Sequence, residues 1–397
     1  MQPGWTIWHR GVGKPTALTF AIMFTLESMA RASLATVIPL QAYALLGRAR
    51  DVSILNFVVG IAGLTASFSI PLLIRRFRRR WMYTAGALAL IAAAALLATA
   101  TLPGQVSGML VRAYGVAALN ITVQLYVMDN IRKRDFVKSE PLKMMLGAFA
   151  WTACPWLGVW LYQNGGPGAA ELFSAGAAVA ALSFFWVLRM QDNPAVRPAT
   201  RPAPSPLANI ARFLAQPRLR LAWIIPFGRS SWWSMFFVYP PLYMVTHGRG
   251  ELAGALLVSA GNALLLLTPF AGRLAARVGL RRPVIAAFLL LGSATLAAAA
   301  AFNAPGAVAA FLLFGAVGAV TLDALGNIPF MRTVHPYERP EMTTVFRTYI
   351  DLSDLLPSGV FAALLSLPGA DIRVVFIASG LWMLVSALFA TRLPRRM

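Results

Sequence analysis

Eight ionisable side chains lie inside long apolar stretches of this sequence, where a charged group is costly. They are Glu27, Arg31, Arg112, Arg229, Asp323, Arg347, Asp351 and Asp354. A charge at the centre of a membrane helix costs about 2.5–3.5 kcal/mol on the insertion scale. A chain that only had to remain in lipid would avoid that cost. We therefore expect these side chains to line a water-filled space or to pair with one another.

Two of the acids are the first candidates for taking up and releasing a proton. Asp323 has no basic residue one helical turn away, and Glu27 lies one turn before Arg31 on the same helix face. A carboxyl group removed from water holds its proton more easily, as proton coupling near neutral pH requires. The Glu27–Arg31 spacing fits both a static pair and one that exchanges protons or solute.

Two further acids share one helix face with a single arginine. Arg347, Asp351 and Asp354 are spaced i, i+4 and i+7. One guanidinium cannot neutralise both carboxylates, so one of them is expected to titrate or to meet Arg229. Asp351 and Asp354 are therefore additional proton-coupling candidates.

Neutral polar and aromatic side chains extend the candidate cavity lining. They are Asn120, Gln124, Asn327, Trp232 and Trp233. Asn120 and Gln124 lie one turn apart, as do Asp323 and Asn327. Aromatic rings next to the Arg229 guanidinium suit amphipathic or aromatic solutes, although ordinary packing explains them equally well.

The composition excludes several classes of protein. Of the 397 residues, 58% are hydrophobic and only 12% are charged, whereas a soluble domain carries about 25% charged residues. Cys154 is the single cysteine, so a disulfide scaffold is excluded. The sequence contains no metal-ligand cluster, nucleophile triad or Gly-rich phosphate loop, and we expect no cofactor, no enzymatic activity and no direct use of ATP. An all-α membrane protein remains.

Twelve apolar segments are long enough to cross a bilayer as helices. They lie near residues 15–46, 52–74, 81–102, 105–131, 143–163, 169–189, 219–246, 251–271, 283–302, 305–331, 342–367 and 372–391. Pro240-Pro241 predicts a kink or break in the seventh. A Pro/Arg-rich linker at 190–218, with a short amphipathic helix at 207–214, separates two six-helix bundles at 1–189 and 219–397.

The basic residues give the expected orientation. The formal net charge is +21, but Lys and Arg fall in short runs between the apolar segments and alternate between rich and poor loops. This pattern indicates a bilayer rather than a nucleic acid as the partner, with both termini in the cytoplasm.

Motifs between and within the segments resemble those of one family. The loop Gly272-Arg273-Leu274-Ala275-Ala276-Arg277-Val278-Gly279 resembles the G-x-x-x-D-R-x-G loop signature of the major facilitator superfamily, with Ala276 in place of the acid. The 6+6 layout fits the internal repeats of these transporters. Cys154-Pro155-Trp156-Leu157-Gly158 resembles the Gly-Pro motif of their exporter branch, with its first glycine replaced.

The resemblance implies a gate at the cytoplasmic loops. Gly272, Arg277 and Gly279 would form a conformational latch, with glycine supplying the backbone angles of the turn. In the first half, Asp129 at the cytoplasmic end of the fourth segment would supply a carboxylate to Arg75 or Arg76 of the equivalent loop. Simple anchoring in the headgroup layer also explains the loop arginines.

The resemblance implies a secondary transporter that works by alternating access. Its cavity would be lined by the first, fourth, seventh and tenth segments, and the mixed charges there favour a charged, zwitterionic or amphipathic solute. We expect proton-coupled efflux by a monomer in a bacterial inner membrane. The alternatives are proton-coupled uptake of an organic anion and a membrane sensor or scaffold that does not transport.

Overall fold

The computed structural model describes residues 17–130, 136–188, 206–335 and 339–394, and every regular element in them is a helix. Within these residues, nine helical stretches are long and apolar enough to cross a membrane. Three further long helices, α6 (Phe136–Asn164), α9 (Pro217–Thr246) and α15 (Arg339–Leu364), cross the same bundle but are less apolar. The all-α membrane fold is confirmed, and the count of twelve spans stays a prediction.

The first half of the chain forms one group of packed helices. It consists of α1 (Ala17–Ala32), α2 (Val37–Leu46), α3 (Ala49–Arg76), α4 (Arg79–Leu97), α5 (Leu102–Asn130), α6 and α7 (Ala169–Val187). Within it α4 packs on α5 and α7, and α1 packs on α6 and α7. We call α1–α7 the N-terminal half.

The second half of the chain forms the other group. It consists of α8 (Pro206–Ala215), α9, α10 (Glu251–Ala263), a 3₁₀ turn η3 (Leu264–Leu267), α11 (Thr268–Val278), α12 (Arg281–Ala300), α13 (Pro305–Leu325), α14 (Ile328–Thr333), α15 and α16 (Ile372–Ala390). Here α12 packs on α13 and α16, and α9 contacts α10, α13, α15 and α16. We call α8–α16 the C-terminal half.

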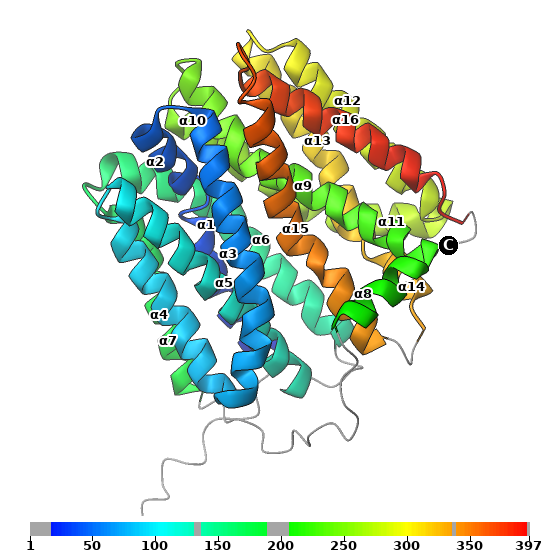
Figure 1. The fold of residues 1–397 in the computed structure, drawn as a ribbon, viewed down its shortest axis with the longest axis horizontal. Helices are drawn as coiled ribbons and strands as arrows, with labels where there is room; N and C mark the ends of the chain where they lie inside the picture. The colour runs from blue at the N-terminus through cyan, green and yellow to red at the C-terminus, as the bar shows by residue number, and fades with distance from the viewer. Residues whose placement is uncertain (1–16, 131–135, 189–205, 336–338, 395–397) are drawn as a thin grey trace, which may run out of the picture.

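Among the described residues, helices of the two halves pack directly on one another. α3 packs on α15, α6 packs on α10, and α2 touches α9. Figure 1 shows this arrangement, with the blue and cyan helices on one side, the yellow and red ones on the other, and α3 beside α15 between them. The predicted domain boundaries at 189 and 219 remain predictions.

Close helix packing depends on small residues. Between α4 and α5, a Cβ added to Gly115 would lie 2.9 Å from the carbonyl oxygen of Gly86. Any side chain at that position would push the two backbones apart. Small residues at helix crossings allow this close approach where lipid supplies no hydrophobic driving force.

Several predicted elements differ in the structure. The segments 15–46, 251–271 and 305–331 are each divided, at residues 33–36, at η3 and at residues 326–327. α9 runs uninterrupted through Pro240 and Pro241, so the predicted break is wrong, while a kink stays a prediction. The short helix at 207–214 is confirmed as α8, but it packs on α9 and α15 and buries Phe213, so it does not simply lie on a lipid surface.

Candidate functional site

A close charged contact joins two helices of the C-terminal half. Arg229 Nη1 on α9 lies 2.7 Å from Asp323 Oδ1 on α13, and the two side chains are only 12% and 15% exposed. The other Asp323 oxygen accepts a hydrogen bond from Trp233 Nε1 at 2.9 Å. The Arg229 guanidinium also lies over the Tyr349 ring of α15, 5.8 Å from its centroid. Asp323 is therefore held as the partner of an arginine.

This pair bears on two sequence-based expectations. Asp323 has no basic residue one turn away on its own helix, and its basic partner comes from a different helix. Arg229 was one expected partner for Asp351 or Asp354, and it contacts Asp323 instead. Spacing along one helix does not reveal a partner on another.

The N-terminal half holds a cluster of different composition, which we call the arginine cluster: Glu27 and Arg31 on α1, and Arg112 and Asn120 on α5. Arg31 Nη1 donates to Asn120 Oδ1 at 3.1 Å, and Arg112 Nη2 donates to the Arg31 carbonyl at 2.8 Å. Both arginines thus donate to neutral oxygens. The cluster contains two guanidinium groups and one carboxylate.

Glu27 is the most deeply placed member of the arginine cluster. It is only 1% exposed, and its carboxylate interacts with Arg31 and lies close to the Tyr83 hydroxyl on α4. The predicted one-turn neighbours, Glu27 and Arg31, therefore do interact, while Arg31 also reaches across to α5.

The two other acids lie where α15 passes the neighbouring helices. Asp351 Oδ1 accepts a hydrogen bond from Ser67 on α3 at 2.9 Å, which joins the two halves, and Arg347 lies near enough to attract it. Asp354 lies near Ser234 on α9 and near Asp351 on its own helix. Its side chain is exposed although it lies in the middle of a long helix.

The neutral candidates lie in different surroundings. Trp233 contacts Asp323, but Trp232 is fully buried, stacks on Phe236 and donates to Thr295 on α12 at 2.9 Å. Asn327 lies between α13 and α14, and its Oδ1 is buried without a hydrogen-bond partner among the described residues. Gln124 is half-buried on α5. Trp232 is therefore packed in the interior of the C-terminal half, whereas Trp233 contacts Asp323 of the charged pair.

The two halves are tied together at one end of the bundle, which we call the tight end. Ser53, in the first turns of α3, and Tyr239, near the end of α9, share a hydrogen bond of 2.7 Å. At the same end, the exposed Gln163 Nε2 donates to Glu251 Oε2 at 3.1 Å. α3 and α9 run in opposite directions, so the last residue of α3, Arg76, and the first residue of α9 both lie at the opposite side of the bundle from the tight end. We call this side the basic end.

The predicted gate residues are only partly described. Gly279 ends α11 with φ +84°, a conformation that favours glycine, as a residue in the turn requires. Gly272 lies inside α11, before the turn. The latch role of both residues stays a prediction. Arg76 and Arg277 are exposed, and the side chains of Arg75 and Asp129 lie outside the described residues.

Several contact residues were missed by the sequence reasoning: Tyr83, Ser67, Ser234, Tyr349 and the Ser53–Tyr239 pair. A signal for part of this set was present. Ser53, Gly60 and Ser67 are spaced by seven, so they share one face of α3, and Gly60 packs against Leu355 of α15. That face contacts the opposite half at all three positions.

Comparison with known proteins gives a family and a fold. The sequence profile of the Major Facilitator Superfamily matches residues 19–356. The fold is similar to that of a POT family transporter solved in complex with 5-aminolevulinic acid, with a TM-score of 0.78, 13% identity and 94% of each chain covered. It is also similar to that of the nucleoside transporter NupG, with a TM-score of 0.71, 14% identity, and 95% of this chain and 99% of that chain covered. A comparison with curated proteins gives no match.

Proposed function

Because this chain belongs to the Major Facilitator Superfamily and is a membrane transporter, we propose that it moves a solute carrying a carboxylate by proton-coupled alternating access. The observation that carries the proposal is the unequal charge of the two halves. The arginine cluster holds two guanidiniums and one carboxylate, whereas Arg229 is already neutralised by Asp323 at 2.7 Å.

The arginine cluster is suited to a carboxylate because its donors are not consumed by a second acid. Arg31 donates one hydrogen bond to the Asn120 side chain, and Arg112 donates one to the Arg31 backbone carbonyl. A guanidinium has five N–H groups, so donors remain for a solute, and hydrogen bonds to charged groups are the strong ones.

A second charge on the solute is supported by the acids of α15. Asp351 accepts a hydrogen bond from Ser67, while Asp354 lies near Ser234 and is exposed. An amino group could bind there while a carboxylate binds at the arginine cluster. The solute class proposed is therefore zwitterionic, and 5-aminolevulinic acid, which a POT family transporter of similar fold binds, is a rational first solute to test.

Proton coupling would act through the Arg229–Asp323 pair and Glu27. Protonation of Asp323 would release Arg229, and the loss of that attraction would favour reorientation of α9 against α13. Glu27 would respond in the same way through Arg31. Two residues on different halves would then link protonation to rocking of the halves.

We propose export as the direction of transport, because Cys154-Pro155 with Gly158 resembles the exporter motif. Uptake of an organic anion is the second candidate, favoured by the two arginines of the N-terminal half. The clusters of exposed arginine at the basic end support a bacterial inner membrane with that end in the cytoplasm. Function as a monomer is part of the same proposal.

The proposal is tested with purified protein in proteoliposomes and labelled 5-aminolevulinic acid. A pH gradient imposed in each direction should drive net movement of solute against the proton flow, and Arg112→Gln should abolish it. Arg249→Gln, at an exposed loop position, is the matched control. Movement with the proton flow would favour uptake, and equal rates without a gradient would remove proton coupling.

A further inference from the structure

A cavity of about 440 Å³ lies between α9, α15 and α16, apart from the charged groups. Phe227, Trp232 and Met383 form its buried floor, while Leu356, Val360 and Leu381 at its rim are exposed. In a membrane protein an exposed apolar rim faces lipid. None of the lining residues is ionisable. Its size is within the range of about 300–1,000 Å³ that small-molecule pockets occupy.

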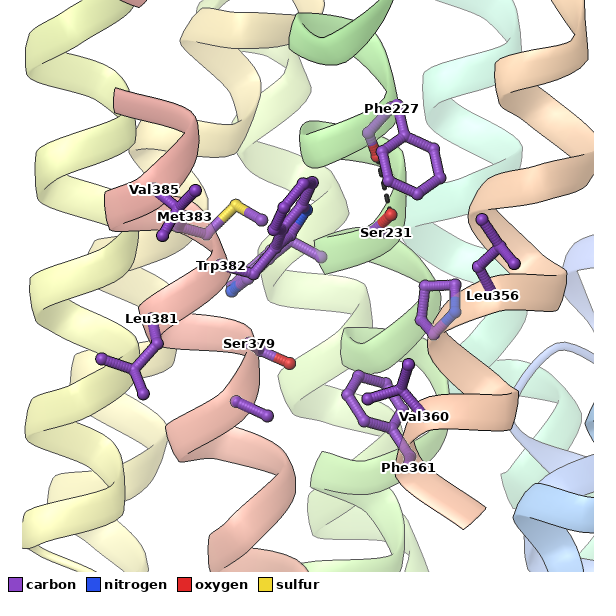
Figure 2. A pocket seen from close by; sticks show the side chains of 13 residues that line it. Phe227, Ser231, Leu356, Val360, Phe361, Ser379, Leu381, Trp382, Met383 and Val385 are labelled. Carbon is purple, nitrogen blue, oxygen red and sulfur yellow. Dashed lines mark hydrogen bonds between the residues drawn. The ribbon is translucent and has the colours of Figure 1, made fainter. Parts of the chain in front are cut away.

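Two polar atoms in this apolar wall have no hydrogen-bond partner among the described residues. They are Ser379 Oγ and Trp382 Nε1, both on α16. Ser379 is only 4% exposed, and Figure 2 shows its hydroxyl pointing from α16 toward the side chains of α15. Buried polar groups are normally hydrogen-bonded, because an unmade bond is costly.

The other serines nearby show the usual solution. Ser231, in the same cavity, donates to the Phe227 carbonyl at 2.8 Å, the bond drawn in Figure 2. Ser386, two turns after Ser379 on α16, donates to the Trp382 carbonyl at 2.9 Å. Ser379 does not bond to its own helix in this way. Its hydroxyl is left directed into the cavity.

We propose that this cavity binds a neutral lipophilic molecule carrying one hydrogen-bond acceptor, such as a ketone carbonyl, which enters from the bilayer. Ser379 and Trp382 donate to the acceptor, and the apolar walls hold the remainder. A plain acyl chain would leave both donors unmatched, and a charged molecule would find no opposite charge. The bound molecule lies between α9 and α15, the helices that carry Arg229 and Asp354.

Benzophenone is the probe, since it is neutral, lipophilic and has a single carbonyl acceptor. Its matched control is diphenylmethane, which has the same rings and no acceptor. With the full-length protein in lipid nanodiscs, benzophenone should bind at least about threefold more tightly than diphenylmethane. On irradiation it should attach to residues of this cavity, with Met383 the expected site by mass spectrometry. Equal binding of the two compounds, or attachment elsewhere, would overturn the proposal.

Two variants locate the interaction. Ser379→Ala should weaken benzophenone binding about threefold to tenfold, the value of one hydrogen bond, and leave diphenylmethane binding unchanged. Ala378→Phe should fill the cavity and remove labelling of Met383. Ser293→Ala, an exposed serine of α12, is the control. If Ser379→Ala lowers the binding of both compounds equally, or of neither, the carbonyl is not recognised and the proposal fails.

Discussion

The charged groups of the two halves are satisfied in different ways. In the C-terminal half, Arg229 and Asp323 face one another at 2.7 Å with Trp233 as an additional donor. In the N-terminal half, Arg31 and Arg112 donate to an amide and to a backbone carbonyl. The Arg229–Asp323 arrangement cancels charge, whereas the arginine cluster has two guanidinium groups and only the Glu27 carboxylate, which interacts with Arg31. The C-terminal half thus holds a neutralised pair, while the N-terminal half keeps one guanidinium in excess, and this excess is why we propose that an anion binds there.

Breaking the Arg229–Asp323 pair should give the largest effect. Asp323→Leu leaves Arg229 buried without its acid, and removal of one partner of a buried pair costs about 3–5 kcal/mol of unfolding free energy. The double variant Arg229→Met with Asp323→Leu should recover most of that loss, because no unpaired charge remains. Denaturation of the wild type, the single variants Asp323→Leu and Arg229→Met, and the double variant gives the coupling energy between the two side chains. A single variant as stable as the wild type would show that the pair is not a unit.

Removing a guanidinium from the arginine cluster should affect binding more than stability. Arg112→Gln should weaken binding of a carboxylate solute about tenfold to 100-fold, since hydrogen bonds to charged groups are worth about 1.5–3 kcal/mol. Its unfolding temperature without solute should change little. Titration calorimetry with 5-aminolevulinic acid measures the binding. Unchanged affinity would place the anion elsewhere.

Removing the neutral acceptor of Arg31 should have a smaller effect. Asn120→Leu deletes the bond of 3.1 Å from Arg31 Nη1, and the loss of one such bond is expected to cost about 1–2 kcal/mol of unfolding free energy. The effect on stability should be well below that of Asp323→Leu. If the two variants destabilise the protein equally, the contrast between the halves is wrong.

Weakening the tight end should give the smallest effect. Tyr239→Phe removes the bond to Ser53 and should shift the closed–open balance of that end by about 1 kcal/mol, or about fivefold. Spin labels at Asn164 and Arg249, exposed residues of opposite halves, report the opening in a Cys154→Ala background, because Cys154 is the only cysteine. Tyr114→Phe is the matched control. A distance distribution equal to that of the wild type would show that this bond does not hold the end closed.

The sequence was sufficient for the fold class because the signals are local. Apolar runs of helix length and basic loops depend on neighbouring residues, and α8 and Gly279 were predicted in the same way. Contacts between helices were not predictable. Asp323 has no basic residue one turn away on its own helix, and its partner Arg229 is 94 positions earlier in the chain, where spacing along one helix cannot reveal it. Asn120 was grouped with Gln124, but its contact is with Arg31.

The helix breaks were also beyond the sequence reasoning. Pro240 and Pro241 are strong local breakers, yet α9 continues through them, since its packing on the surrounding helices outweighs the local preference. Conversely, Thr36 and the residues before it interrupt an apolar run that has no proline until Pro39. Tertiary packing decides such positions.

The most direct test of the account separates exchange from accumulation in proteoliposomes. Asp323→Asn keeps the shape of the side chain but cannot take up and release a proton. The account predicts that this variant still exchanges labelled for unlabelled solute but no longer accumulates solute when a pH gradient is imposed. Arg112→Gln should lose both exchange and accumulation. Full gradient-driven accumulation by Asp323→Asn would contradict the claim that the Arg229–Asp323 pair couples protons to transport.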